Sequence, residues 1–158
     1  MEYDFDIYQL SSKFLADYPE DTYPELMYKQ GRPYCCLLID THDDYFICVP
    51  YRSFINHTNA FLFDGTQRSM NSPSGLDYSK IVIIKSNDYL DNVRPIVDRD
   101  EYNETVKNIQ RIARDALTYV DTYVKHMTGV ATIHPRQFAR KYQYSTLPYF
   151  HPELGISC

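Results

Sequence analysis

The first half of the chain is rich in β-strand patterns, and its first segment alternates hydrophobic and polar residues in the two-residue period of a half-exposed strand. Tyr3, Phe5 and Ile7 alternate with acidic residues and predict a first strand. Two β-rich runs follow, YCCLLID (34–40) and YFICVP (45–50), and the polar residues 41–44 between them predict a hairpin. The runs AFLF (60–63) and LDYSKIVIIKS (76–86) predict two further strands, the second of them buried on both faces at its centre.

The second half changes to a period of about three and a half, which is typical of amphipathic helices. Residues 98–127 predict one long helix, with a capping box formed by Asp98 and Glu101 and a stop at Gly129. Its predicted buried stripe comprises Val106, Ile109, Ala113, Ala116, Leu117, Val120, Val124 and Met127.

Shorter elements complete the pattern. Residues 12–18 predict a helix capped by Ser11 or Ser12, and residues 135–142 predict a short basic helix. Residues 19–33 have three prolines and a glycine and predict a loop or broken helix, and residues 64–75 predict a polar loop that is either mobile or functional. The apolar tail 147–156 is expected to dock. The sum is an α+β fold: an antiparallel sheet of about five to six strands with one long helix.

The length of 158 residues predicts one domain, 1–158. The acidic start MEYDFDIYQL is unlike a signal peptide, and every apolar run is too short to cross a bilayer. The four cysteines have no zinc-like spacing, which favours buried reduced thiols and a cytoplasmic location. No membrane partner is expected.

The net charge of −5 argues against a nucleic-acid partner, but the charge is unevenly distributed. Residues 1–25 carry seven acidic residues and one lysine, so the rest of the chain is close to +1. A local basic surface is therefore compatible with the sequence. Its candidate side chains are Lys29, Arg32, Arg52, Arg68, Lys80 and Lys85.

The candidate chemistry is concentrated in VPYRSFINHTNAFLF (49–63). We expect the strand to end at its proline and to deliver Arg52 and Ser53 into a short polar connection, with His57 close behind. A permanent cation, a hydroxyl and a group that titrates near neutrality suit phosphodiester chemistry. The alternative is that Ser53 caps a turn while Arg52 and His57 are solvated loop residues.

Other chemistries lack their motifs. The sequence has no GxxxxGK[ST], GxGxxG, GxSxG or HExxH, and no metal or cofactor is expected. The acids 40, 43 and 44 beside His42 are better explained by an exposed hairpin turn than by metal binding. RNA cleavage by the ribose 2′-hydroxyl fits what is present: Arg52 would stabilise charge, His57 would transfer a proton, and Ser53 would orient the phosphate or the 2′-hydroxyl.

A basic groove would bind RNA phosphates, and tyrosines would stack on its bases. Lys80 and Arg32 could add positive charge to the site, although for each residue taken alone a solvated strand end is the favoured interpretation. Tyr51 and Tyr78 are candidate stacking residues, with core packing as the alternative. Arg136 and Arg140 of the short basic helix could extend the groove.

Four segments together resemble the ToxN/AbiQ family of endoribonuclease toxins from type III toxin–antitoxin systems, closest to the CptN and TenpN branch. The segments are RPYCCLLI (32–39), VPYRSFINHTNAFLF (49–63), SGLDYSKIVII (74–84) and YFHPELGI (149–156). The resemblance implies a compact, highly twisted antiparallel sheet similar to the Kid and MazF toxins. It also implies metal-independent cleavage that leaves 2′,3′-cyclic phosphate and 5′-hydroxyl ends.

The resemblance further implies an RNA partner: a small structured antitoxin RNA of pseudoknot repeats, which the toxin processes and which inhibits it in a closed heteromeric complex. Cellular or phage RNA would be the substrate.

The family's catalytic Ser/Thr matches Ser53, and Arg52 stands where ToxN members often have threonine. The lysine that follows in ToxN is replaced by Ile55 and Asn56, with His57 just beyond. The implied catalytic set is Ser53, His57, Arg52 and Lys80, and the implied RNA-binding set is Tyr28, Lys29, Arg32, Tyr51, Asn56, Arg68, Tyr78, Arg136 and Arg140. A non-catalytic RNA- or protein-binding module of the same fold is the alternative function.

Overall fold

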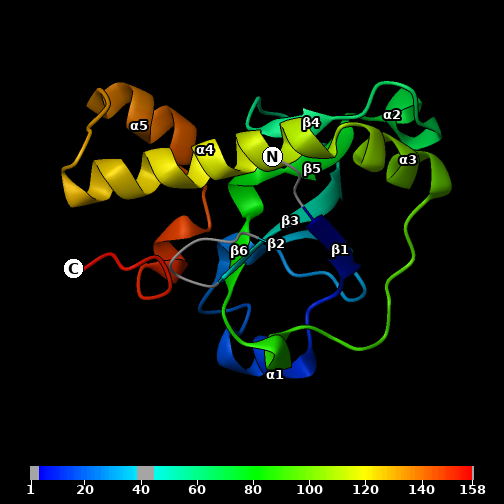
Figure 1. Ribbon diagram of the computed structural model, residues 1–158, viewed down its shortest axis with the longest axis horizontal. Helices are drawn as coiled ribbons and strands as arrows, with labels where there is room; N and C mark the ends of the chain where they lie inside the picture. Colours follow the sequence, from blue (N-terminus) through cyan, green and yellow to red (C-terminus); the bar gives the residue numbers. More distant parts are fainter. Residues whose placement is uncertain (1–3, 39–44, 158) are drawn as a thin grey trace.

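In a computed structural model, the protein is an antiparallel sheet packed against helices (Figure 1). The structure describes residues 4–38 and 45–157. The predicted α+β class is confirmed. The sheet order is β1-β2-β3-β5-β4, and β6 pairs with β3. The strands are β1 (Asp4–Tyr8), β2 (Tyr34–Leu38), β3 (Phe46–Ser53), β4 (Ala60–Leu62), β5 (Ser74–Asp77) and β6 (Val82–Ile84). The similarity to Kid and MazF stays a prediction.

The central strand β3 changes its partner halfway along its length. Its first part pairs with β6 up to Cys48, and its last part pairs with β5 from Tyr51 onward, while β2 pairs along the other side. The expectation that the strand ends at Pro50 is wrong. The Tyr51 N–H donates to the Pro33 carbonyl on the β2 side, so the Pro50 nitrogen faces the interval between β6 and β5. A proline there removes no ladder hydrogen bond, and β3 continues to Ser53.

The predicted strand over residues 76–86 is two strands separated by the 3₁₀ helix η2 (Tyr78–Lys80). The Asp77 side chain accepts the Ser79 backbone N–H at 2.9 Å and so caps this turn. Because of this turn, β5 pairs with the C-terminal part of β3, and β6, which follows directly in sequence, pairs with its N-terminal part. Nothing local in the hydrophobic pattern marks this break.

The predicted long helix is also two elements, α3 (Arg99–Lys107) and α4 (Ile109–Thr128), which meet at Asn108. At Asn108 the backbone leaves helical geometry, with φ −112° and ψ 18°, and the Asn108 side chain donates to the Glu104 carbonyl at 2.8 Å. The buried face of α4 includes Tyr119 and Tyr123, whereas Val106 and Met127 from the predicted stripe are 46% and 40% exposed. The stop at Gly129, with φ +76°, is confirmed.

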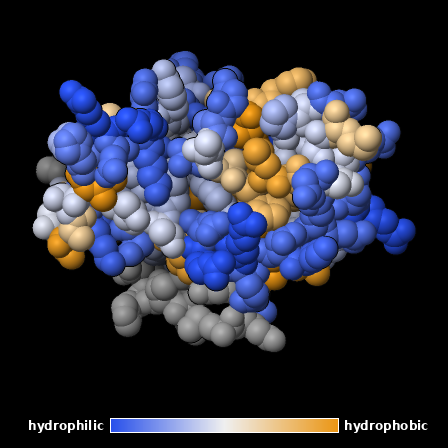
Figure 2. All heavy atoms as spheres, turned by 90° about the horizontal axis from the view of Figure 1, so that it is seen from above, coloured by the Kyte–Doolittle hydropathy of each residue, from blue (hydrophilic) through white to orange (hydrophobic). Residues whose placement is uncertain are grey.

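Three shorter α-helices complete the helical part of the described chain. They are α1 (Ser12–Asp17), capped by Ser11 as expected, α2 (Gln67–Asn71) and α5 (Pro135–Tyr142). Short 3₁₀ helices occupy Pro24–Leu26 (η1), Asn87–Tyr89 (η3) and Leu147–Phe150 (η4). Figure 1 shows α5 at the end of α4 that lies away from α3 and α2. From above, hydrophilic side chains cover most of the surface around a smaller hydrophobic area (Figure 2).

The segment 64–75 is ordered by α2 and by its attachment to α3. Thr66 and Ser69 form a reciprocal capping box at the start of α2. The backbone N–H groups of Asp64 and Gly65 donate to the Glu104 carboxylate at 3.3 Å and 3.2 Å. These hydrogen bonds hold the segment 64–75 against α3.

The core supports the remaining expectations. Cys35, Cys36 and Cys48 are buried free thiols, and the C-terminal tail docks through Leu147 and Phe150. The hairpin turn at 41–44, with its acidic residues and His42, lies outside the described residues, as does Cys158. Within the ranges 4–38 and 45–157, no helix is both long and apolar enough to span a membrane.

Candidate functional site

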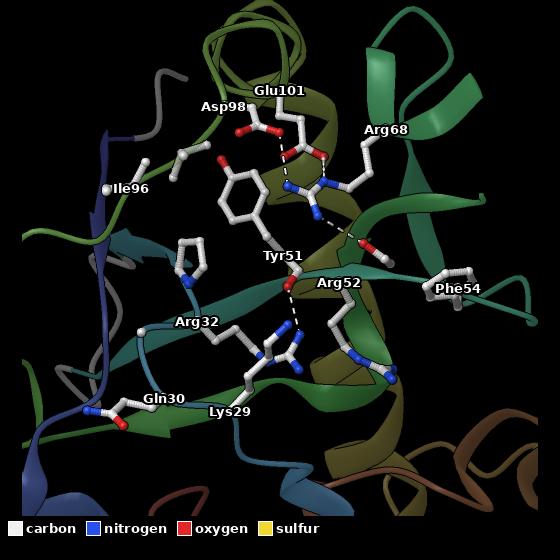
Figure 3. A pocket seen from close by; sticks show the side chains of 14 residues that line it. Lys29, Gln30, Arg32, Tyr51, Arg52, Phe54, Arg68, Ile96, Asp98 and Glu101 are labelled. Atoms are coloured by element: carbon white, nitrogen blue, oxygen red, sulfur yellow. Dashed lines mark hydrogen bonds and ion pairs between the residues drawn. The ribbon is translucent and has the colours of Figure 1, made fainter. Parts of the chain in front are cut away.

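A pocket of about 450 Å³ opens where three separate segments meet (Figure 3). One wall is the turn before β2, another is the end of β3, and the third is the approach to α3, with one arginine added from α2. The lining residues are Lys29, Gln30, Gly31, Arg32, Pro33, Tyr51, Arg52, Ser53, Phe54, Arg68, Ile96, Val97, Asp98 and Glu101. The sequence-predicted residues Lys29, Arg32, Tyr51, Arg52, Ser53 and Arg68 are thus brought together.

Arg68 joins two walls of the pocket. Its guanidinium lies 2.9 Å from the Asp98 carboxylate and 3.4 Å from the Glu101 carboxylate, and it donates to Ser53 Oγ at 3.4 Å. The hydrogen bond with Asp98 raises the pKa of Arg68. Asp98 makes no side-chain cap to α3, so the expected capping box is wrong: both acids are directed to Arg68 instead.

Glu101 is a buried acid in a pocket rich in positive charge. Burial raises the pKa of its carboxyl above the ordinary value, although the Arg68 cation opposes that shift. A carboxyl with a raised pKa is a stronger proton acceptor once ionised. The sequence offered Glu101 only as a helix cap, and its role in the pocket depends on the fold.

Lys29 and Arg32 supply charge that no carboxylate neutralises. Neither forms an ion pair within the part of the chain that the structure describes. Arg32 Nη1 donates to the Tyr51 carbonyl at 3.0 Å, which fixes the guanidinium against β3. Burial and then the neighbouring Arg52 lower the pKa of Arg32. An anion bound here would relieve the repulsion between the two guanidinium groups.

Behind the pocket, the carboxylate of Asp77 organises three side chains. It is fully buried and lies 2.5 Å from Arg52 Nη1. His57 Nε2 lies 3.2 Å from the same oxygen, and Ser79 Oγ donates to the other oxygen at 2.6 Å. Asp77 sits in the SGLDYSK run, but only the structure shows that it is the common partner of these groups.

His57 is held at both ring nitrogens. Its Nδ1 accepts the Asn59 backbone N–H at 3.0 Å, so Nδ1 carries no proton and the neutral ring has its proton on Nε2, facing Asp77. His57 does not line the pocket. The structure therefore does not place His57 in the pocket that Ser53 lines, and proton transfer by His57 stays a prediction.

Lys80 is likewise separated from the pocket. Its side chain is buried, and Nζ donates to Glu25 Oε1 and to the Tyr144 carbonyl, both at 2.7 Å. These bonds tie η2 to the segment before β2 and to the C-terminal region. Lys80 was expected to add a second charge to the site, but in this structure it links η2 to two other segments of the chain.

The remaining predicted RNA-binding residues divide by burial and position. Tyr51 and Tyr78 are buried, and the Tyr51 hydroxyl is paired with Thr105 Oγ1 at 2.7 Å, so their rings are unavailable for base stacking. Both tyrosines pack in the core, as the alternative interpretation had it. Outside the pocket lie Tyr28, Asn56, Arg136 and Arg140, the last two exposed on α5.

Sequence reasoning missed four side chains that line the pocket. Phe54 and Ile96 are highly exposed apolar side chains at its lining, and Asp98 and Glu101 are its acids. The sequence signal that could have identified Phe54 is its position directly after the candidate residues Arg52 and Ser53. In the described ranges no group of three or more His, Cys, Asp or Glu side chains is arranged to hold a metal ion.

Comparison of the chain with protein-family models, with curated proteins and with solved structures gives no match in any of the three.

Proposed function

We propose that this chain is a metal-independent, sequence-selective endoribonuclease toxin of a type III toxin–antitoxin system. The observation that carries the proposal is the convergence of the Ser53 hydroxyl with four basic side chains in one pocket. Two of them, Lys29 and Arg32, form no ion pair with any carboxylate among residues 4–38 and 45–157, so the pocket is suited to an anion such as an RNA phosphate. The resemblance of residues 32–84 and of the C-terminus to ToxN/AbiQ toxins supports the same function.

The chemistry uses the substrate's own nucleophile. The ribose 2′-oxygen attacks the adjacent phosphorus, the bond from phosphorus to the 5′-oxygen breaks, and the products are a 2′,3′-cyclic phosphate and a 5′-hydroxyl. Arg32 and Arg52 stabilise charge on the non-bridging oxygens, and Ser53 positions the phosphate. Glu101 accepts the proton of the 2′-hydroxyl, and the leaving 5′-oxygen takes a proton from solvent.

The same pocket would bind the inhibitory partner. A small antitoxin RNA of pseudoknot repeats, processed by this pocket and then retained, would block access for cellular or phage RNA. Closed heteromeric assembly and a cytoplasmic location belong to this proposal.

The test is cleavage of a defined single-stranded RNA by the purified chain in excess EDTA, followed by analysis of the product ends. Cyclic phosphate and 5′-hydroxyl ends are expected, and Ser53→Ala should abolish them while the far-UV circular dichroism stays unchanged. Thr132→Ala, an exposed hydroxyl outside the pocket, is the matched control. Full activity of Ser53→Ala would refute the assignment.

A non-catalytic RNA-binding module is the second candidate. It is favoured by the engagement of both His57 nitrogens and of Lys80 in fixed internal contacts, which leaves fewer groups for proton transfer. Tight RNA binding with no cleavage of varied RNAs would select this candidate. Cleavage that follows the titration of Glu101 would exclude it.

A further inference from the structure

Phe54 has an unusual backbone and an unusual exposure. Its φ is +57°, in the left-handed region that bulky residues rarely adopt, and its side chain is 78% exposed. An aromatic ring normally gains stability by burial, and this one gains little. Neither local propensity nor core packing therefore accounts for a phenylalanine at this position.

The flanking residues hold Phe54 in this conformation. Ser53 before it is paired with Ser74 of β5, and Ile55 after it is buried and donates its N–H to the Pro73 carbonyl at 2.9 Å. The chain is fixed on both sides, so the turn directs the ring outward. Strain that is maintained by its surroundings is typical of binding and catalytic sites.

The ring projects beside the phosphate-binding groups. Phe54 lines the same pocket as Arg32, Arg52 and Ser53, and Figure 3 shows it on the side of the pocket away from Ile96, with the Arg52 guanidinium on its own side. A strand of RNA held by its phosphate at these arginines must place the attached base next to the pocket. A flat, exposed aromatic ring there offers a face to an unstacked base.

We propose that Phe54 is a stacking platform for one nucleobase of single-stranded RNA whose phosphate lies at Arg32 and Arg52. This inference rests on the proposed function and specifies its substrate as RNA with an unpaired base at the site. It also replaces Tyr51 and Tyr78, which are buried, as the aromatic group that reads the strand.

The test measures binding without cleavage. A fluorescent single-stranded octamer of mixed sequence with 2′-fluoro sugars has no attacking hydroxyl, and a fully abasic octamer has the same phosphates without bases. The wild type should bind the base-bearing octamer roughly 5- to 150-fold more tightly than the abasic one, the range expected for one stacked base. Phe54→Ala should lose most of that difference and leave abasic binding unchanged.

Two further variants define the cause. Phe54→Trp should retain the preference because it keeps a flat ring, and Met70→Ala, which removes an equally exposed apolar side chain outside the pocket, should change nothing. Thermal unfolding checks that each variant is folded. Pairing the octamer with its complement should remove the effect of Phe54→Ala.

Equal base preference in Phe54→Ala and wild type would overturn the stacking role, even if the wild type cleaves RNA. Conversely, a preference that depends on Phe54 in a chain that never cleaves would retain the platform and overturn the nuclease. The two failures are therefore distinguishable.

Discussion

Asp77 is the position at which one substitution tests the arrangement behind the pocket. Its carboxylate is fully buried and is shared by Arg52, His57 and Ser79. Replacement by asparagine keeps the shape and one oxygen acceptor but removes the negative charge. Arg52, whose side chain is only 15% exposed, would then be a largely desolvated cation without an ion-pair partner.

The expected loss of stability follows from this geometry. Removing one member of a buried pair typically costs about 3–5 kcal/mol, because the remaining charge stays desolvated. Asparagine can still accept the Ser79 N–H that caps η2, so we expect the low end, about 3 kcal/mol. For a chain of this size, that loss lowers the melting temperature by about 6–12 °C.

Urea unfolding at pH 7, followed by circular dichroism, measures the change. Asp121→Asn is the control, because Asp121 pairs with Lys125 at 2.9 Å on the exposed surface of α4. It should change the free energy of unfolding by no more than about 0.5 kcal/mol. The double variant of Asp77→Asn with Arg52→Met should be less destabilised than the sum of the single variants.

A free energy of unfolding for Asp77→Asn within 0.5 kcal/mol of the wild type, on the scale of an exposed pair, would refute the reasoning. Additive effects in the double variant would also refute it. Either result would mean that Arg52 is stabilised by solvent or by other groups, and that Asp77 does not hold it.

Three other predictions concern separate parts of the molecule. Gly75→Ala should prevent stable folding, because its Cβ would lie 1.9 Å from the Phe61 carbonyl oxygen; Gly65→Ala, with no contact closer than 3.7 Å, should remain soluble and folded in the same expression test. Lys80→Met should lower the free energy of unfolding by about 1–3 kcal/mol, because Lys80 links η2 to two other segments, and should leave cleavage per folded molecule unchanged. A variant that keeps full stability but loses cleavage would contradict this structural role. In the folded state Glu101 retains its proton to a higher pH than in the unfolded state, so the wild type should lose stability relative to Glu101→Gln as the pH rises above the ordinary pKa of 4.5; urea unfolding across pH would show no such loss if burial does not raise that pKa.

The elements that were predictable are those whose signal is local. Alternation found β1, β-rich apolar runs found β2 and β3, and the change to a helical period found α4, because each of these signals lies within a single segment. The break at η2 escaped prediction because distant partners cause it, and the break at Asn108 escaped because the helical period continues across it. A strand splits at η2 since β3 is shared by β5 and β6, which no local pattern records.

The sequence predicted which residue types form the site better than it predicted which acidic side chains pair with them. Arg52 and Ser53 were identified from spacing, and they do line the pocket. The acids that decide which cations are available come from elsewhere in the chain. Asp77 engages His57, and Glu25 engages Lys80, so both candidates are held by carboxylates, while Arg32 forms no ion pair within the described residues.

The separation of the pocket walls along the chain determines when the pocket can first exist. Ser53 ends β3, whereas Asp98 and Glu101, which hold Arg68 against it, lie at the start of α3. Domains are synthesised from the N-terminus, so a nascent chain has its hydroxyl and arginines well before it has the acids that arrange them. A ribosome-bound chain that ends before α3 lacks one wall of the pocket, so the pocket cannot form until about two thirds of the 158 residues have been synthesised.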